Sequence, residues 1–200
     1  IIFMGTSGNV VQILSSILDN GHQVISVYTQ PDRRAGRGRK PVSSAVKIFA
    51  KNSGLSISQP VSLLRDPEAK SSLMDLEPDL IVVASYGQIL PAEVVNEPPL
   101  GCLNIHPSLL PKYRGASPVA TAILEGDSHT GVTLMKLDSG MDTGPILAQR
   151  KTEIGSEETT DALTTRLLSI GSELLIESLI PWARGEMTAT DQDEKLATHT

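Results

Sequence analysis

Short apolar runs alternate along the chain with segments in which hydrophobic residues recur every three or four positions. The apolar runs, rich in β-branched residues and bounded by Gly, Pro or Asn, are Ile1–Met4, Val24–Thr29 and Leu80–Ala84. Such runs predict strands, and the helical spacing that follows each of them predicts a β-α-β order. The pattern therefore indicates an α/β fold.

The helical segments carry one apolar face each. The first is expected to end at Asn20-Gly21, a favourable C-terminal stop, and its apolar face consists of Val10, Val11, Leu14, Ile17 and Leu18. Three further helices are predicted over Val42–Asn52, Asp66–Leu76 and Glu158–Ile180, with Pro181 closing the last.

Leu80–Ala84 is hydrophobic at every position, which is typical of a parallel strand covered on both faces. In such sheets function is expected beyond the carboxyl ends of the strands. Later strands are predicted at Cys102–Ile105, Val132–Leu137 and Ile146–Thr152, the last two joined by a Gly-rich loop. We expect a doubly wound, mostly parallel, Rossmann-like sheet.

Composition limits the classes of protein that need to be considered. The 200 residues, 40% hydrophobic and 20% charged, suffice for one main domain, which we expect over residues 1–184. Hydrophobic residues thin out over 185–200, which predicts a linker. The chain contains neither an apolar run of about 18 residues nor a signal-peptide pattern. Its single cysteine, Cys102, agrees with a reducing compartment, so we expect the cytoplasm. We also expect a monomer that does not contact a membrane.

The charge is unevenly distributed. The net charge is −6, yet residues 33–40 hold five of the seventeen Lys and Arg residues and no acidic residue. Subtracting those five positive charges from −6 leaves −11. A concentrated basic segment on an acidic chain suggests either one localised anionic partner or a solvated loop.

The turn Gly5-Thr6-Ser7-Gly8-Asn9 joins the first predicted strand to the first helix. Free backbone N–H groups at a helix start can bind an anion, but the turn lacks the GxGxxG pattern, so it does not imply NAD. A purely structural turn is the alternative.

Two polar side chains lie at the end of the strand that begins at Cys102. If residues 102–106 are extended, Asn104 and His106 leave the same face, and Pro107 disfavours helical angles for His106. An amide donor beside an imidazole could stabilise a developing oxyanion, and one such donor is worth roughly 2.7–4 kcal/mol. From these residues alone a buried structural histidine and a turn-forming asparagine remain equally possible. The other histidines are scattered, so no metal site is predicted.

Two loops follow this pair in the sequence. Residues 109–118 contain a shaped loop with Arg114 in its middle, and Ser117-Pro118 has the pattern of a helix start. Residues 138–144 form an Asp- and Gly-rich turn that lacks the ligand alternation of a calcium loop. Either loop could be a simple connection or a wall of the site.

Together these segments resemble the signatures of formyltransferases that use 10-formyltetrahydrofolate. The run Asn104-Ile105-His106-Pro107-Ser108-Leu109-Leu110-Pro111, continuing through Tyr113-Arg114-Gly115, resembles the first signature, and Asp138–Gly144 resembles the second. The resemblance implies that Asn104, His106 and Asp142 are catalytic. It also implies a folate site formed by Tyr86, Gly87, Gln88, Ile89, Leu90, Ser108, Leu109, Leu110, Pro111, Asp138 and Gly140.

The basic segment resembles a loop that the methionyl-tRNA branch of this family uses against the acceptor arm. The resemblance implies methionyl-initiator tRNA as partner and contacts from Arg33, Arg34, Arg37, Arg39 and Lys40. It also implies that residues 185–200 lead to a C-terminal tRNA-binding domain absent from this chain. One departure is Gly5-Thr6-Ser7-Gly8-Asn9, where the family usually has Gly-Thr-Pro-Asp-Phe.

Other functions remain open at this point. A formyltransferase acting on glycinamide ribonucleotide or a sugar nucleotide would not need the basic segment. A hydrolase releasing formate from the same folate, and a binding domain without catalysis, are the remaining alternatives.

Overall fold

A computed structural model describes residues 1–35 and 40–200, with the backbone alone for residues 34, 35 and 40. The chain divides into two units, Ile1–Gly101 and Cys102–Thr200. Each unit has its own strands, helices and buried core.

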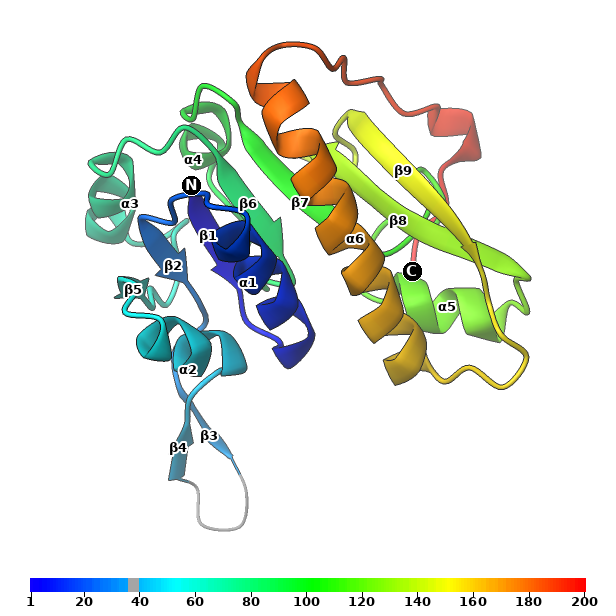
Figure 1. Cartoon of the computed structure of the whole chain (residues 1–200), viewed down its shortest axis with the longest axis horizontal. Helices are drawn as coiled ribbons and strands as arrows, with labels where there is room; N and C mark the ends of the chain where they lie inside the picture. The colour runs from blue at the N-terminus through cyan, green and yellow to red at the C-terminus, as the bar shows by residue number, and fades with distance from the viewer. Residues whose placement is uncertain (36–39) are drawn as a thin grey trace. The chain divides into compact units, whose positions relative to one another are not determined.

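The first unit contains four parallel strands in the order β5-β2-β1-β6. Figure 1 shows these strands side by side, with the β3–β4 hairpin extending away from them. In chain order its elements are β1 (Ile2–Gly5), η1 (Gly8–Val10), α1 (Val11–Asp19), β2 (Ser26–Tyr28), β3 (Arg33–Ala35), β4 (Lys40–Val42), α2 (Ala45–Asn52), β5 (Ile57–Ser58), α3 (Pro67–Met74), β6 (Ile81–Ala84) and α4 (Ala92–Asn96).

The core of the first unit follows from the apolar runs. Ile2, Phe3 and Met4 of β1 have no exposed surface, and neither do Ile81 and Val82 of β6. Residues of a central parallel strand are covered on both faces, which explains why these runs are hydrophobic without alternation. The prediction of buried parallel strands is confirmed.

The close approach of β1 and β6 requires a glycine where β1 ends. A Cβ atom on Gly5 would lie 2.8 Å from Phe3 Cε1 and 3.0 Å from the Ala84 carbonyl oxygen. A side chain at this position would therefore displace backbone as well as the aromatic ring.

The second unit contains three antiparallel strands in the order β7-β8-β9. Helix α6 packs against all three strands. In chain order the elements of the second unit are β7 (Cys102–His106), α5 (Pro118–Leu124), β8 (His129–Lys136), β9 (Ile146–Glu153), α6 (Thr160–Ala183) and η2 (Glu194–Leu196).

Most predicted elements are present, with two corrected boundaries. Helix α2 begins at Ala45 rather than Val42, because Val42 belongs to β4 and Ser44 caps the helix by accepting from the Lys47 amide. Helix α6 continues through Pro181 to Ala183. Pro181 has no N–H to donate to the carbonyl four residues earlier, and the helix ends within the following turn, where the Glu186 amide donates to the Pro181 carbonyl.

The C-terminal residues are attached to the second unit. Thr190 pairs with Ile146, each amide donating to the other's carbonyl at 2.8 Å. The Arg114 amide donates to the Thr198 carbonyl, and the Thr200 amide donates to the Arg114 carbonyl. Residues 190–200 are thus held along an earlier loop, although they contain little regular secondary structure. The domain boundary expected at residue 184 stays a prediction.

Candidate active site

Asn104 and His106 lie on β7, where the extended backbone points their side chains to one face. In the antiparallel register they stand opposite Met135 and Thr133 of β8. Asn104 is half-buried, whereas His106 is only 4% exposed. The predicted shared face is confirmed, because alternate residues of a strand project to the same side.

The His106 imidazole lies between two acceptor groups. Its Nε2 is 2.9 Å from the Tyr113 carbonyl oxygen, and its Nδ1 is 3.6 Å from Asp142 Oδ2. A carbonyl oxygen only accepts, so Nε2 carries a proton and donates it to Tyr113. Nδ1 is the ring nitrogen that faces the Asp142 carboxylate.

Asp142 reaches His106 from the loop between β8 and β9. Its backbone has φ of 55°, a left-handed conformation that is uncommon outside glycine. The oxygen that faces His106, Oδ2, also accepts a 2.9 Å hydrogen bond from the Gly115 amide. The carboxylate is therefore oriented by a backbone donor from a second loop.

Hydrogen bonds within the loop itself set its path. Asp138 Oδ1 accepts from the Gly140 amide at 2.9 Å and from the Thr143 hydroxyl at 2.8 Å. A Cβ atom on Gly144 would collide with the Lys136 carbonyl oxygen, and one on Gly140 would collide with the Thr143 side chain. The two glycines and Asp138 thus serve the tight turn that carries Asp142.

The segment after β7 is fixed by the neighbouring strands. Buried Thr133 of β8 donates to the Ser108 carbonyl at 2.6 Å and accepts from the Leu110 amide at 3.1 Å. Gln149 of β9 donates to the Leu110 carbonyl at 2.8 Å. Ser108 and Leu110 are buried, and the Ser108 hydroxyl donates to the Lys112 carbonyl, so these two side chains support the loop. Their predicted contact with folate stays a prediction.

The other predicted folate residues, 86–90, lie in the first unit, directly after β6. Tyr86 is buried, and burial raises the pKa of its hydroxyl above the ordinary value. Gln88 joins this segment to residues 60–63 by donating to the Pro60 carbonyl and accepting from the Leu63 amide.

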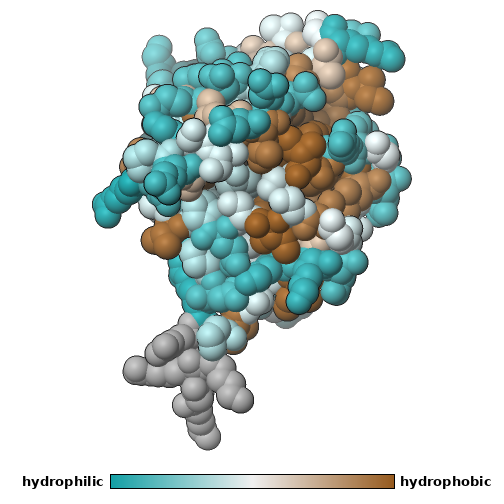
Figure 2. All heavy atoms as spheres, turned by 90° about the vertical axis from the view of Figure 1, so that its left-hand side faces the viewer, coloured by the Kyte–Doolittle hydropathy of each residue, from teal (hydrophilic) through white to brown (hydrophobic). Residues whose placement is uncertain are grey.

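Exposed hydrophobic side chains lie on both segments that Gln88 joins. Ile89 is 74% exposed, Val61 82% and Leu64 57%. Figure 2, which faces the side of the first unit with α3, β5 and α2, shows hydrophobic side chains in patches among hydrophilic ones. Such patches often mark binding surfaces.

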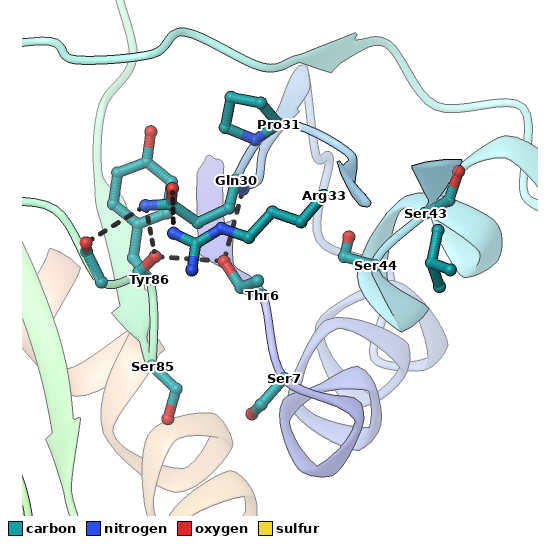
Figure 3. A pocket seen from close by; sticks show the side chains of 11 residues that line it. Thr6, Ser7, Gln30, Pro31, Arg33, Ser43, Ser44, Ser85 and Tyr86 are labelled. Carbon is teal, nitrogen blue, oxygen red and sulfur yellow. Dashed lines mark hydrogen bonds between the residues drawn. The ribbon is translucent and has the colours of Figure 1, made fainter. Parts of the chain in front are cut away.

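A cavity of about 480 Å³ lies within the first unit where β1, β2 and β6 end (Figure 3). Gln30 shapes one wall by donating to the Tyr86 and Gly87 carbonyls, each at 3.1 Å. Figure 3 shows Arg33 lying across the cavity, where its guanidinium donates to Gln30 Oε1 at 3.4 Å. The lining residues are Thr6, Ser7, Gln30, Pro31, Arg33, Val42, Ser43, Ser44, Ser85, Tyr86 and Gly87.

Sequence reasoning did not predict this cavity. The turn after β1 was a possible signal, because it follows a strand and opens a helix. The contribution of Ser43 and Ser44 had no local signal, since it depends on how the β3–β4 hairpin folds back.

The predicted tRNA-binding residues are only partly placed. Arg33 lines the cavity, and Arg34 and Lys40 contribute backbone to the β3–β4 ladder. Arg37 and Arg39 lie outside the described residues. Over residues 1–35 and 40–200, no three His, Cys, Asp or Glu side chains group as metal ligands. Within the same ranges, every helix is too short or too polar to span a bilayer.

Sequence reasoning also missed the environment of Arg114. Its side chain is 1% exposed, and its guanidinium contacts Gln192 and Glu194. The sequence indicates only that this loop is a connection or a wall of the site. These partners are 78 and 80 residues away, so no local pattern indicates them.

Comparison with known proteins identifies similar chains. The family model described as formyl transferase matches residues 1–179. A curated protein named methionyl-tRNA formyltransferase, from Methylococcus capsulatus, is 48% identical over 199 residues, and the match covers 100% of this chain and 64% of that protein. This chain therefore spans less than two thirds of its relative's length.

Solved structures share the fold at lower identity. Glycinamide ribonucleotide transformylase 1 from Symbiobacterium toebii has a TM-score of 0.77 at 22% identity, covering 96% of this chain and 92% of that chain. An N-formyltransferase from Helicobacter canadensis, in complex with folinic acid and dTDP-3-aminofucose, has a TM-score of 0.74 at 22% identity, covering 100% of this chain and 69% of that chain. The predicted doubly wound, mostly parallel, Rossmann-like fold is thereby confirmed.

Proposed function

This chain belongs to the formyl transferase family, and on that basis we propose that it transfers a formyl group from 10-formyltetrahydrofolate to the α-amino group of methionyl-initiator tRNA. The observation that carries the chemical part is the buried His106, held between the Tyr113 carbonyl and the Asp142 carboxylate beside the Asn104 amide on the same strand. An amide donor next to an imidazole donor suits a reaction that develops negative charge on oxygen.

The reaction begins when the neutral amine attacks the formyl carbon. A carbon–nitrogen bond forms, and the carbonyl electron pair moves to oxygen in a tetrahedral intermediate. A free α-amine has a pKa of roughly 7.7–8.0, and esterification to tRNA removes the adjacent negative charge, so a neutral fraction exists near pH 7. Collapse of the intermediate breaks the bond to N10 of the folate, which leaves as tetrahydrofolate after taking up a proton.

Asn104 and His106 would stabilise the oxyanion. The Asn104 amide would donate to the oxygen, and one preorganised donor contributes roughly 2.7–4 kcal/mol in such transition states. The Nδ1 edge of His106 is the natural second donor, because Nε2 is already bonded to Tyr113. The 3.6 Å between Nδ1 and Asp142 exceeds a normal hydrogen bond, so this proton can be shared with a substrate oxygen.

Asp142 would have two roles. Its negative charge favours the protonated form of His106, and its carboxylate can accept the proton released by the attacking amine, directly or through water. The Gly115 amide holds Oδ2 in place, so the carboxylate needs little reorganisation during the reaction.

The folate contacts that we propose are the ones implied by the family resemblance, namely residues 86–90, residues 108–111, Asp138 and Gly140. Ile89, 74% exposed, offers apolar surface for the flat rings. Since the Ser108 and Leu110 side chains are buried, their segment would present mainly backbone N–H and C=O groups. These groups match the alternating donors and acceptors of a pterin edge.

The tRNA acceptor is supported by the name of the curated relative and by the basic segment, where Arg33, Arg34, Arg37, Arg39 and Lys40 would contact phosphates. Solved structures at 22% identity include enzymes named for other acceptors, so likeness of fold does not select the acceptor.

The decisive experiment gives the complete protein 10-formyltetrahydrofolate with methionyl-initiator tRNA, glycinamide ribonucleotide, an amino sugar nucleotide, or water alone. Formyl transfer to the tRNA at least about 10²-fold faster than to either small amine supports the proposal. Formate release without tRNA at the rate seen with tRNA would identify a hydrolase instead, and preference for a small amine would overturn the acceptor.

A further inference from the structure

Arg114 is a buried cation whose partners come from the end of the chain. Its Nε and NH2 groups donate to Gln192 Oε1 at 3.0 and 2.9 Å. Its NH1 and NH2 groups donate to the Glu194 carboxylate at 3.0 and 2.7 Å. The Glu194 hydrogen bond is the main reason that the pKa of Arg114 is raised, and the Asp138 and Asp142 carboxylates contribute. A buried guanidinium requires such partners, so residues 192–194 are held firmly against the loop.

Gln192 connects Arg114 to the loop that carries Asp142. While its Oε1 accepts from Arg114, its Nε2 donates to the Asp142 carbonyl at 2.8 Å and to the Gly144 carbonyl at 2.7 Å. The side-chain amide thus bonds on both sides, which fixes its orientation as well as its position. It holds the backbone of Asp142 where φ is 55°.

The same C-terminal segment also holds the other acceptor of His106. The Tyr113 amide donates to the Thr198 hydroxyl at 2.8 Å, and the Tyr113 carbonyl accepts from His106. The backbone of Arg114 pairs with Thr198 and Thr200. The next residue is Gly115, and its amide donates to the Asp142 carboxylate. Both groups that face the imidazole are therefore fixed from residues 190–200.

We propose that residues 190–200 form a positioning strap for the active site and that Gln192 is its central positioning residue, setting the distance between His106 and Asp142. This inference rests on the proposed function, because the positioned groups are those that would stabilise the oxyanion. Gln192 acts through the backbone of Asp142 and touches no reacting atom. Its effect is expected on the chemical step rather than on substrate binding.

Gln192→Glu is the sharpest test. The new carboxylate keeps an acceptor for Arg114 but replaces the donor that faces the Asp142 and Gly144 carbonyls, so it repels the loop while preserving side-chain volume. In the complete protein we expect kcat for formyl transfer to fall about 10²-fold, the loss that roughly 1 Å of misplacement can cause, while KM for both substrates changes less than about 2-fold. The matched control is Gln23→Glu, the same change at an exposed position outside the strap, with kcat expected within about 2-fold of wild type.

A spectroscopic readout separates this inference from the proposed function. The ¹⁵N and ¹H signals of the His106 ring are expected to shift in Gln192→Glu and to stay in place in Gln23→Glu, whether or not the protein transfers formyl groups. Thr198→Val, which removes the bond to the Tyr113 amide from an exposed position, is expected to shift the same signals and carries the test if Gln192→Glu does not fold.

Unchanged His106 signals in the folded variants, or an equal loss of kcat in Gln23→Glu, would overturn the strap. A wild-type protein without formyl transfer, but with the expected shifts, would overturn the proposed function alone.

Discussion

At the scale of single residues, the site depends on which groups face the two ring nitrogens of His106. Both are acceptors, and neither is a neighbour of His106 along the chain: Tyr113 lies 7 residues away and Asp142 lies in another loop. The ring is therefore held in one orientation, with Nε2 as a hydrogen-bond donor, in a buried environment where polar interactions are stronger than in water.

Asn104 provides the cleanest test of the proposed oxyanion contact. Asn104→Asp keeps the shape of the side chain but replaces its N–H donor by a carboxylate oxygen. We expect the single-turnover rate of formyl transfer to fall at least about 10²-fold, because one preorganised donor is lost and a repulsive charge is added. Rapid-quench measurement at saturating folate and acceptor gives this rate.

Asn20→Asp, an isosteric change with the same change of charge at the exposed end of α1, serves as the control and is expected to leave the rate unchanged. An Asn104→Asp rate within 3-fold of wild type would remove Asn104 from the mechanism.

How much of the site could be predicted depended on the range of the interaction. The shared face of Asn104 and His106 followed from the two-residue period of a strand. The role of Asp142 came from family resemblance, because no physical rule brings a loop 36 residues away to His106. The contact between Gln192 and Arg114 had no sequence signal, since a glutamine in a polar segment looks the same whether it is solvated or bonded on both sides.

At the scale of elements, prediction succeeded where packing agreed with local pattern. Strand β6 and helix α6 were expected because their hydrophobic residues are consistently spaced and become buried. Prediction failed where tertiary contacts decide. The hairpin β3–β4 and the two-residue strand β5 have too little apolar surface to leave a pattern, and Val42 was assigned to a helix because its neighbours fit one.

Gly171 lets α6 approach β7 closely, and a methyl group there is expected to be destabilising. Its Cβ would lie 2.5 Å from Ile105 Cγ2 and 3.0 Å from Val132 Cγ2, both on buried strands. Replacing a helical glycine by alanine gains roughly 1 kcal/mol in helix propensity, but overpacking a rigid core costs about 1–3 kcal/mol. Because a β-branched side chain cannot easily move, we expect Gly171→Ala to lower the free energy of unfolding by about 1–2 kcal/mol, measured by urea denaturation.

The contact with Ile105 can be isolated by a double-mutant cycle. In an Ile105→Ala background, where the Cγ2 atom is missing, the cost of Gly171→Ala should largely disappear. An equal cost in both backgrounds would place its cause outside this contact.

Glu158 and Arg166 join the start of α6 to β9. Arg166 donates to both Glu158 oxygens at 2.8 and 2.7 Å, to the Thr152 hydroxyl at 2.6 Å and to the Glu153 carbonyl at 2.8 Å. The Arg166 hydrogen bond holds the pKa of Glu158 below 4.5, although desolvation opposes the shift. A lowered carboxyl pKa in the folded state means that the ionised form stabilises the fold.

This linkage predicts a pH-dependent effect of Glu158→Gln. At pH 7 the free energy of unfolding of the variant should be about 1 kcal/mol lower than that of wild type. The difference is small because the Arg166 side chain is 37% exposed and screened by solvent. The stabilisation is present above the unfolded pKa of 4.5 and is lost as pH falls through the lower folded pKa, so the difference between the two proteins should shrink as pH falls below 4.5. Chemical denaturation across this range measures the difference, and Glu157→Gln, an exposed neighbour, should show none. A difference that does not shrink as the carboxyl becomes protonated would exclude the ion pair as its cause.

At the scale of the whole molecule, the α/β class followed from the order of apolar runs, and the antiparallel strands of the second unit were expected only as a pair joined by a loop. The direction of these later strands was not predicted, because their short runs, unlike the uninterrupted run at Leu80–Ala84, do not distinguish a parallel neighbour from an antiparallel one. Charge is a different kind of whole-chain property, since it can be read from composition without knowledge of the fold. It carries the acceptor part of the proposed function.

The distribution of charge predicts how the complete protein responds to salt. If the basic segment contacts phosphates, each lost contact should weaken tRNA binding whatever the nucleotide sequence of the tRNA. Each lost contact should also lower the slope of log Kd against log salt concentration by about 1. We therefore expect Arg37→Ala/Arg39→Ala to reduce this slope by about 2 and to raise KM for tRNA at least about 10-fold, with KM for the folate unchanged. Lys51→Ala/Arg65→Ala removes the same charge from outside the segment and tests whether net charge alone is responsible. Either double variant would change the net charge of the chain from −6 to −8. Equal slopes for the two variants would therefore show that the acidic molecule repels tRNA as a whole and that residues 33–40 are not a binding site.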